Sequence, residues 1–184
     1  EDELRAMEKV NTLQAHQLTR IEVKHKLGGG NFSEVFYGVW NAETPVALKR
    51  LNDREALDEF LAEAKVLSGL NHPNVVQLLG FYTEPDSGAQ YIVTEYLSKG
   101  SLLATLKGER EQIGTPDQLK IVAQCAAGMV YLEGRKILHR DLAARNVLVT
   151  YMDGRYVAKI SDFGLSRATE NNYYTSSTKE IPVR

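Results

Sequence analysis

Two short runs in the second half of the sequence carry residue types that bind metal ions and accept protons. Asp141 and Asn146 lie five residues apart, between apolar runs typical of short strands. Asp162 follows another apolar run at 157–160. Phosphoryl transfer needs a base near the attacking hydroxyl and oxygen ligands for Mg²⁺, and these three side chains supply such oxygens. Asp and Asn also favour turns, but turn propensity does not explain the joint spacing.

A glycine-rich segment near the start is a candidate phosphate-binding loop. Residues 28–33 read GGGNFS, which matches G-x-G-x-x-G except that Ser33 replaces the last glycine. A dinucleotide fold needs a helix after such a loop, whereas a strand-like run follows here. A Walker loop needs a Gly-Lys pair, which the sequence lacks. A glycine hairpin between two strands offers backbone N–H groups to phosphates, although taken alone an ordinary glycine hairpin explains the motif better.

Lys49 and Glu63 are candidate phosphate-orienting residues. Lys49 lies in the strand-like run 46–51, where a lysine usually faces solvent. Glu63 precedes Leu67 by four residues on a predicted helix over 54–69, about 40° round the helix, so it lies at the edge of the apolar face. A Lys49–Glu63 ion pair would hold the ammonium for the α- and β-phosphates. A solvent-facing Glu63 explains its position equally well from the residues alone.

The flanking patterns predict an α+β chain in two parts. Strand-like runs at 21–27, 35–40, 46–51, 75–82 and 91–96, with the helix over 54–69, predict a five-stranded antiparallel sheet with one helix. Residues 1–19 are a flanking linker or helix, 20–97 the small lobe and 98–184 the first part of a mainly helical large lobe.

The predicted large lobe begins at the turn 99–101. A short helix follows near 101–107. A long, buried helix runs over 116–134, with Thr115 as N-cap, Pro116 at its first position and Gln118 completing a capping box. Short strands are expected at 137–138, 147–149 and 157–160, with a longer hairpin turn at 151–155. After Arg167 we expect a mobile loop.

Composition excludes several classes of protein. The 184 residues are 43% hydrophobic and 25% charged, which suits a soluble globular protein. The net charge of −2 gives no overall positive field that would attract nucleic acid. Cys125 is the single cysteine, which excludes an internal disulfide framework. The sequence has no apolar run of membrane-spanning length and no signal peptide. It does not begin with Met, so it is expected to be an excerpt, and its parent could be membrane-spanning.

The motifs together resemble the protein kinases, and specifically the tyrosine kinases. The run 139–146, HRDLAARN, resembles the tyrosine-type catalytic loop, because serine/threonine kinases usually carry a lysine where Ala143 stands. The run 161–165 contains Asp-Phe-Gly. The run 179–184, KEIPVR, resembles the tyrosine kinase substrate loop, in which Pro182 would pack under a tyrosine ring. The resemblance covers roughly residues 20–184 and implies a two-lobed kinase fold that is incomplete at its C-terminal end.

The resemblance also implies roles for individual residues. Asp141 would be the catalytic base, and Arg145 would hold the substrate hydroxyl. Asn146 and Asp162 would bind Mg²⁺, and Lys49 with Glu63 would orient the phosphates. The residues expected to contact ATP, with Thr94 as gatekeeper and Glu95 and Leu97 offering backbone groups to the purine, are Leu27, Gly28, Gly29, Gly30, Asn31, Phe32, Ser33, Val35, Ala47, Lys49, Thr94, Glu95, Leu97 and Leu148.

Two further groups of residues are regulatory candidates by resemblance. Tyr173 and Tyr174 are expected to be phosphorylated, and a phosphate of about −1.5 to −2 charge could pair with Arg140 and order the loop. The alternative is that both are merely exposed tyrosines. An apolar column is expected to mark the active state, formed by Leu67, Leu78, His139 and Phe163.

The sequence therefore predicts a cytoplasmic protein tyrosine kinase that uses ATP and Mg²⁺. Its partners would be a protein substrate with an acceptor tyrosine and an activating kinase or a second copy in trans. The alternative is a nucleotide-binding but catalytically incompetent fragment or scaffold. Serine/threonine or dual specificity is a third possibility, against which Ala143 and Pro182 argue. The sequence stops at Arg184, before the Ala-Pro-Glu region; if the molecule ended there, the helix over 116–134 would expose apolar surface.

Overall fold

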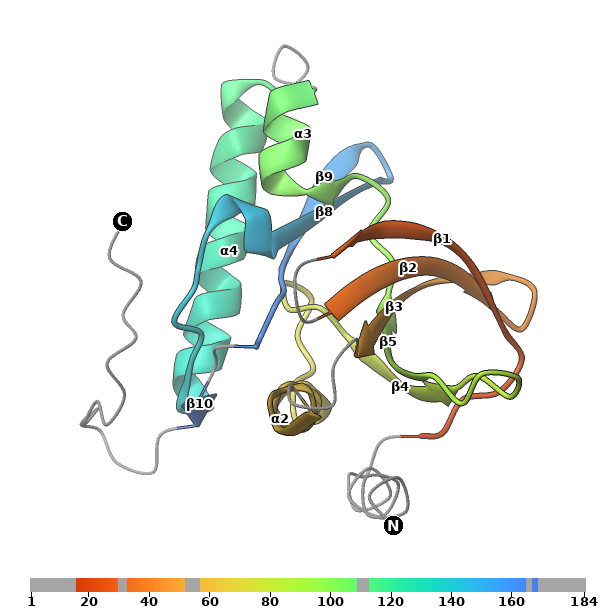
Figure 1. Cartoon of the computed structure of the whole chain (residues 1–184). Helices are drawn as coiled ribbons and strands as arrows, with labels where there is room; N and C mark the ends of the chain where they lie inside the picture. Colours follow the sequence, from red (N-terminus) through yellow and green to blue (C-terminus); the bar gives the residue numbers. More distant parts are fainter. Residues whose placement is uncertain (1–15, 30–32, 52–56, 109–112, 165–166, 169–184) are drawn as a thin grey trace.

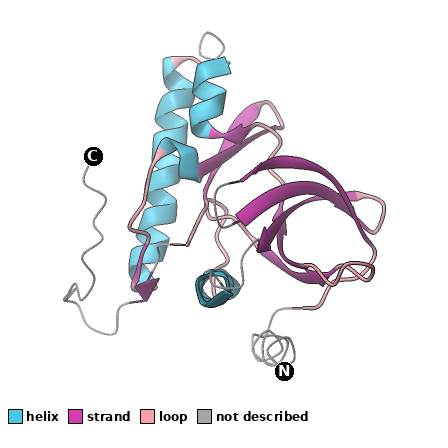
Figure 2. Ribbon diagram, viewed as in Figure 1, coloured by secondary structure: helices cyan, strands magenta, loops and turns pink. Residues whose placement is uncertain are grey.

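The structure is a computed structural model that describes residues 16–29, 33–51, 57–108, 113–164 and 167–168. One part is a strongly curved sheet with a helix beside it, and the other is built around two helices and a β-hairpin (Figure 1). The strands of the sheet are gathered on one side and the two helices α3 and α4 on the other (Figure 2). The α+β architecture with two groups of elements agrees with the fold predicted from the sequence.

The sheet has five antiparallel strands in the order β1-β2-β3-β5-β4. Alternating residues place one apolar set on a single face of the sheet, in a core that includes Val46, Leu48 and Val93. The residues before β1 close this core, because Leu18 is buried and its N–H donates to the Phe81 carbonyl at 2.7 Å. The strand bounds are β1 (Ile21–Gly29), β2 (Ser33–Trp40), β3 (Thr44–Leu51), β5 (Gln90–Glu95) and β4 (Leu78–Thr83).

Strand β4 begins at Leu78, so the predicted strand start at Val75 is wrong. The backbone of residues 74–76 pairs instead with the other part of the chain. Ile160 N–H donates to the Asn74 carbonyl, Val76 N–H donates to the Ile160 carbonyl, and both distances are 2.9 Å. Val75 is 1% exposed at this junction. The apolar run that indicated one long strand therefore serves two sheets.

Helix α2 (Leu57–Ser68) packs its apolar face into the second core. Phe60, Ala64 and Leu67 are buried at the i, i+4, i+7 spacing that predicted the helix. Residues 54–56 and the side chain of Leu57 lie outside the described residues. The helix thus brings Glu63, on the turn between Phe60 and Leu67, against the sheet.

The remaining elements form the second part of the chain. Helix α3 (Leu102–Gly108) and helix α4 (Thr115–Gly134) lie on one side of a hairpin of β8 (Val147–Met152) and β9 (Arg155–Ile160) (Figure 1). The short strand β6 (Gly100–Ser101) pairs with β8, and β7 (Ile137–Leu138) pairs with β10 (Arg167–Ala168). The turn of the hairpin is Asp153-Gly154, with φ of 52° and 76°, the conformation that favours Gly. The hairpin agrees with the turn predicted at 151–155.

The predicted cap of α4 is wrong by one residue. Gly114 is the N-cap, and no side chain caps the helix. Thr115 is already helical, so its hydroxyl does not occupy the capping position, and Gln118 Nε2 donates to the Ile113 carbonyl at 3.0 Å. The helix ends at Gly134 as predicted.

Helix α4 buries only one of its faces. Ile121, Gly128 and Leu132 are buried, but the side of the helix that carries Leu119, Val122 and Val130 is exposed by 65–69%. Among the described residues, the expectation of a buried helix therefore holds for one face, and the other face exposes apolar side chains, as the sequence analysis expected of this helix.

Candidate active site

The catalytic-loop residues lie between β7 and β8. A 3₁₀ turn, Ala144–Asn146, ends the loop and places the Asn146 side chain in the interior, 5% exposed. Asn146 Nδ2 donates to the Asp141 carbonyl oxygen at 2.8 Å and to Asp141 Oδ2 at 2.9 Å. Arg145 Nη2 donates to Asp141 Oδ1 at 2.5 Å. Each carboxylate oxygen of Asp141 is therefore fixed by a different neighbour.

The electrostatic surroundings of Asp141 favour its ionised form. Partial burial alone would raise the pKa of the Asp141 carboxyl, but the hydrogen bonds from Arg145 and Asn146 and the positive charge of Arg145 outweigh it. The pKa of Asp141 is consequently below its ordinary value, and the side chain is a carboxylate at neutral pH.

A buried histidine joins the catalytic loop to the segment that carries Asp162. His139 is 2% exposed, its Nδ1 accepts the Asp141 N–H at 3.3 Å, and its Nε2 lies 2.9 Å from the Ser161 carbonyl. Because Nδ1 accepts, Nε2 carries the proton and donates to Ser161. Ser161 in turn donates from N–H and Oγ to the Asn146 carbonyl, at 2.8 and 3.0 Å. The two loops form one hydrogen-bonded unit.

Lys49, Glu63 and Asp162 come together from three separate elements. Lys49 Nζ lies 2.5 Å from Glu63 Oε2 on α2 and 3.9 Å from Asp162 Oδ1. Burial raises the pKa of the Glu63 carboxyl, and the Lys49 ammonium opposes this by favouring the charged form. The ion pair weighed from the sequence is present, and the lysine faces inward rather than towards solvent.

The Asp-Phe-Gly segment turns sharply to separate a polar residue from an apolar one. Asp162 has φ of 60°, a left-handed conformation that Asp tolerates better than most residues. Its side chain is 53% exposed, whereas Phe163 is 1% exposed in the core with Leu67 and Leu78. The Phe163 ring meets the His139 ring edge-on, with centroids 5.1 Å apart. Phe163 thus shares a core with Leu67 and Leu78 and contacts His139.

Several residues predicted to contact ATP share one face of the sheet. Residues directly opposite on antiparallel strands lie on the same face, as do residues two apart on one strand. Val35 pairs with Lys49 and Ala47 pairs with Thr94, so these four side chains share a face. Leu27 and Gly28 lie on the neighbouring β1, and Leu148 lies on β8. Gly29 pairs with Glu34 on β2.

Other predicted residues lie outside what the structure describes. Gly30, Asn31 and Phe32 are outside the described residues, as is the side chain of Ser33. Tyr173 and Tyr174 are also outside them, so their role stays a prediction. Arg140 lies within the described residues and is half-buried, with φ of 69°.

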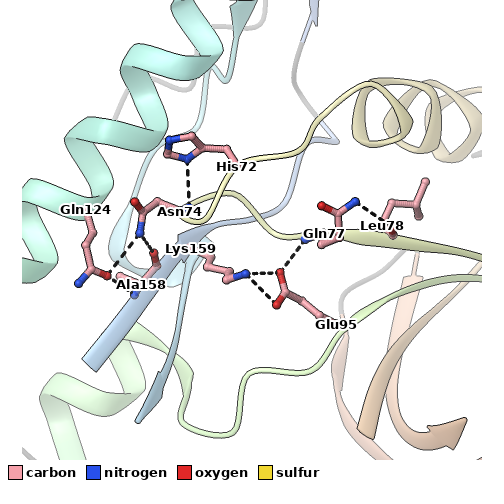
Figure 3. Close-up of polar contacts among 8 residues, drawn as sticks. All are labelled: His72, Asn74, Gln77, Leu78, Glu95, Gln124, Ala158 and Lys159. Atoms are coloured by element: carbon pink, nitrogen blue, oxygen red, sulfur yellow. Dashed lines mark hydrogen bonds and ion pairs between the residues drawn. The ribbon is translucent and has the colours of Figure 1, made fainter. Parts of the chain in front are cut away.

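The Glu95 side chain ties the sheet to the β8–β9 hairpin, a contact that the sequence analysis missed. Lys159 Nζ lies 2.7 and 2.8 Å from the two carboxylate oxygens of Glu95, and the Gln77 N–H donates to Glu95 Oε1 at 2.8 Å (Figure 3). The Glu95 N–H donates to the Gln77 carbonyl at 3.1 Å. Lys159 alternates with buried residues in β9, and this alternation does not indicate a contact with Glu95.

A second polar junction joins α4, β9 and the segment before β4. Asn74 Nδ2 donates to the Ala158 carbonyl at 2.9 Å, and Gln124 Oε1 accepts the Ala158 N–H at 2.6 Å (Figure 3). Gln124 Nε2 also donates to the Tyr156 carbonyl at 3.0 Å. In the sequence, this contact is indicated by a glutamine among the apolar residues of α4.

The candidate Mg²⁺ ligands fit a hard cation by their chemistry. Asn146 uses its amide nitrogen on Asp141, which leaves its amide oxygen as the ligand atom, and Asp162 offers an exposed carboxylate. No group of three or more His, Cys, Asp or Glu side chains that could hold a metal ion occurs among the described residues. A metal here would therefore rely on few protein ligands and on phosphate oxygens, as Mg²⁺ does in phosphoryl-transfer sites.

Comparisons with known proteins agree with this geometry. The family described as protein tyrosine and serine/threonine kinase matches residues 21–184. The chain is 42% identical over 166 residues to tyrosine-protein kinase SRK2 of Spongilla lacustris, covering 89% of this chain and 44% of the relative. It is 41% identical over 169 residues to tyrosine protein-kinase src-1 of Caenorhabditis elegans, covering 90% and 31%. It is 46% identical over 171 residues to tyrosine-protein kinase ABL2 of Homo sapiens, covering 90% and 14%.

The chain belongs to the protein tyrosine and serine/threonine kinase family. The relatives above are all named tyrosine kinases, which confirms the resemblance inferred from the catalytic loop. The chain spans less than half the length of each of these relatives. Among the described residues, no helix is both long enough and apolar enough to cross a membrane.

Proposed function

We propose that the protein transfers the γ-phosphate of MgATP to a tyrosine hydroxyl of a protein substrate. The observation that carries this proposal is the arrangement around Asp141. Its carboxylate is fixed by Arg145 and Asn146, and the same loop is hydrogen-bonded through Ser161 to the segment that carries Asp162. The proposed base and the two proposed metal ligands would thus act from one hydrogen-bonded framework, with Lys49 Nζ 3.9 Å from Asp162 Oδ1.

The nucleotide would lie against the sheet face that carries Lys49. The Lys49 ammonium, held by Glu63, would orient the α- and β-phosphates, and the backbone N–H groups of the glycine hairpin would cover them. Val35, Ala47, Leu27 and Leu148 would enclose the adenine. Asn146 and Asp162 would hold Mg²⁺, which when bound neutralises charge on the phosphates.

Asp141 would orient the acceptor hydroxyl and take its proton. A phenol has a pKa of about 10, far above that of this carboxylate, so Asp141 does not deprotonate tyrosine before the reaction. The phenolic oxygen bonds to the γ-phosphorus while the bond from that phosphorus to the bridging oxygen of ADP breaks. As the phenolic oxygen loses electron density, its proton becomes acidic and passes to Asp141. Arg145, which contacts Asp141, would also contact the hydroxyl.

The acceptor residue is assigned to tyrosine by the catalytic loop. Ala143 stands where serine/threonine kinases usually carry a lysine, and the relatives are named tyrosine kinases. We place the activity in the cytoplasm, with a protein substrate and an activating kinase or a second copy in trans as partners. Tyr173 and Tyr174 would be the activating phosphorylation sites, and Arg140 would pair with the phosphate.

Phospho-amino-acid analysis tests the acceptor. The whole protein is incubated with labelled MgATP and with two copolymer substrates that differ only in carrying tyrosine or serine. Label should appear on the tyrosine substrate as phosphotyrosine and be lost in Lys49→Met. Label on serine alone, or MgATP binding with no transfer to either substrate, would contradict the proposal.

A further inference from the structure

Glu34 forms an ion-pair bridge across three strands of the sheet. Lys26 Nζ on β1 lies 2.6 Å from Glu34 Oε1, and Arg50 Nη2 on β3 lies 2.5 Å from Glu34 Oε2. Each oxygen of the carboxylate thus binds a cation from a different neighbouring strand. The Glu34 side chain is 20% exposed, less than either cation. Both partners lower the pKa of the Glu34 carboxyl, and the hydrogen bond from Lys26 has a larger effect than the one from Arg50.

The bridge lies on the face of the sheet opposite to Lys49. Glu34 pairs with Arg50, while its neighbour Val35 pairs with Lys49, and successive residues of a strand face opposite ways. Glu34 therefore does not contact a nucleotide bound on the Lys49 face. Any effect on that nucleotide must pass through the strand backbones.

The backbone pairing of β1 is interrupted where the bridge crosses it. Register shifts occur between Val23 and Lys26 and again between Lys26 and Gly28. Beyond them, Gly28 pairs with Val35 and Gly29 pairs with Glu34. The side-chain bridge thus spans the irregular stretch that leads into the glycine hairpin. A β-bulge locally weakens the ladder, so a side-chain link there has backbone freedom to restrain.

Arg50 is itself held in place on the same face. Its guanidinium lies 5.0 Å from the centroid of the Phe36 ring, and the Phe36 ring meets the Tyr91 ring edge-on at 6.3 Å. Tyr91 is 2% exposed, so this stack is anchored in the sheet core. A cation held over a ring has fewer conformations to lose, which favours a lasting contact with Glu34.

We propose that Glu34 is a positioning residue for the nucleotide phosphates: by joining Lys26 to Arg50 it keeps Gly28 and Gly29, at the end of β1, in fixed register with Lys49. The inference rests on the proposed function, because it assumes that MgATP lies on the Lys49 face. An exposed ion pair adds little to stability, so loss of the bridge should leave the melting temperature nearly unchanged. Its loss should weaken binding of phosphates and leave adenine binding unchanged.

The test compares nucleotides with and without phosphates in the whole protein. Glu34→Gln should weaken MgADP binding and raise KM for MgATP about three- to fivefold, with adenosine affinity, kcat and melting temperature unchanged. Arg50→Gln should give the same pattern, and the double variant should add little, because both changes break one bridge. Glu22→Gln is the matched control, since Glu22 pairs with Lys24 of its own strand at 3.4 Å.

The outcomes separate this inference from the proposed function. If the wild-type protein binds MgADP but Glu34→Gln matches Glu22→Gln, the inference is wrong and the proposed function stands. An equal loss of MgADP and adenosine affinity in Glu34→Gln, with a lower melting temperature, shows a structural role and also overturns it. If the wild-type protein binds no MgADP, the proposed function fails and the inference fails with it.

Discussion

At the scale of single residues, the residue types and their spacing in the catalytic loop predicted which side chains lie in contact. Asn146 lies five residues after Asp141, and a single 3₁₀ turn brings its amide back to the Asp141 carboxylate. The inward direction of Lys49 was left open by the sequence, since a strand lysine usually faces solvent. Burial of Glu63 on α2 decides it, because the buried carboxylate needs a cation.

Other residue contacts could not be predicted because they join distant segments. The pair of Glu95 and Lys159 is separated by 64 residues, and its formation depends on how the hairpin docks on the sheet. The tautomer of His139 depends on two backbone groups that only the folded loop brings together. Short-range patterns carry no information on either.

The lowered pKa of Asp141 predicts how its contribution to stability depends on pH. The folded state favours the carboxylate, so the contribution is present above the unfolded pKa of about 3.9 and is lost as the pH falls through the lower folded pKa. The difference in unfolding free energy between the wild type and Asp141→Asn should therefore stay constant from pH 7 to about 5. It should shrink as the pH falls below the unfolded pKa of about 3.9. Urea unfolding at a series of pH values measures it.

Asp153→Asn is the control for that titration. Asp153 is exposed in the turn of the hairpin, where its φ of 52° suits Asn equally well. This variant measures how the unfolding assay responds to the exchange of an exposed carboxylate for an amide. A difference for Asp141→Asn that grows on acidification would show that the carboxylate is not stabilised by its neighbours.

At the scale of elements, periodicity predicted the strands and helices but not where every one of them begins. The five antiparallel strands and α2 follow from alternating and i, i+4, i+7 apolar patterns. The start of β4 and the cap of α4 were wrong. Val75 pairs with β9 through a long-range contact, and Gly114 displaced Thr115 as the cap residue. The ends of elements depend on long-range pairing and on which neighbouring residue takes the cap position. Apolar periodicity carries no information on either.

The crossing of α4 over the junction predicts a cost for a single methyl group. A Cβ at Gly128 would lie 2.7 Å from the Asn74 carbonyl oxygen and 2.8 Å from Ile160 Cδ1. The Asn74 oxygen already accepts the Ile160 N–H, so it is not free to move. Gly128→Ala should lower the unfolding free energy by about 1–3 kcal/mol, measured by urea denaturation.

Gly134→Ala provides the matched control on the same helix. Nothing lies within 4 Å of a Cβ at Gly134, so the change should leave stability unchanged or raise it slightly. If Gly128→Ala were as stable as Gly134→Ala, the close approach of α4 to Asn74 would not exist in solution.

At the scale of the whole molecule, two kinds of connection place Lys49 near Asp162. One is the chain itself, which passes from β5 through Leu97 to β6. The other is the junction of the 74–77 segment and Glu95 with β9. Hydrogen bonds there reach three consecutive residues, 158–160, of the strand that leads into Asp162. The distance of 3.9 Å between Lys49 and Asp162 is a product of both connections. It could not be predicted from either motif alone.

The most direct test of the account separates nucleotide binding from phosphoryl transfer. Asp141→Asn in the whole protein should bind MgADP as the wild type does, because the role proposed for Asp141 is to bind the acceptor hydroxyl. It should lower transfer to a tyrosine substrate by about 10²–10⁴-fold. Asp153→Asn should retain full activity. Transfer by Asp141→Asn at the wild-type rate, with binding intact, would contradict the assignment of Asp141 as the catalytic base.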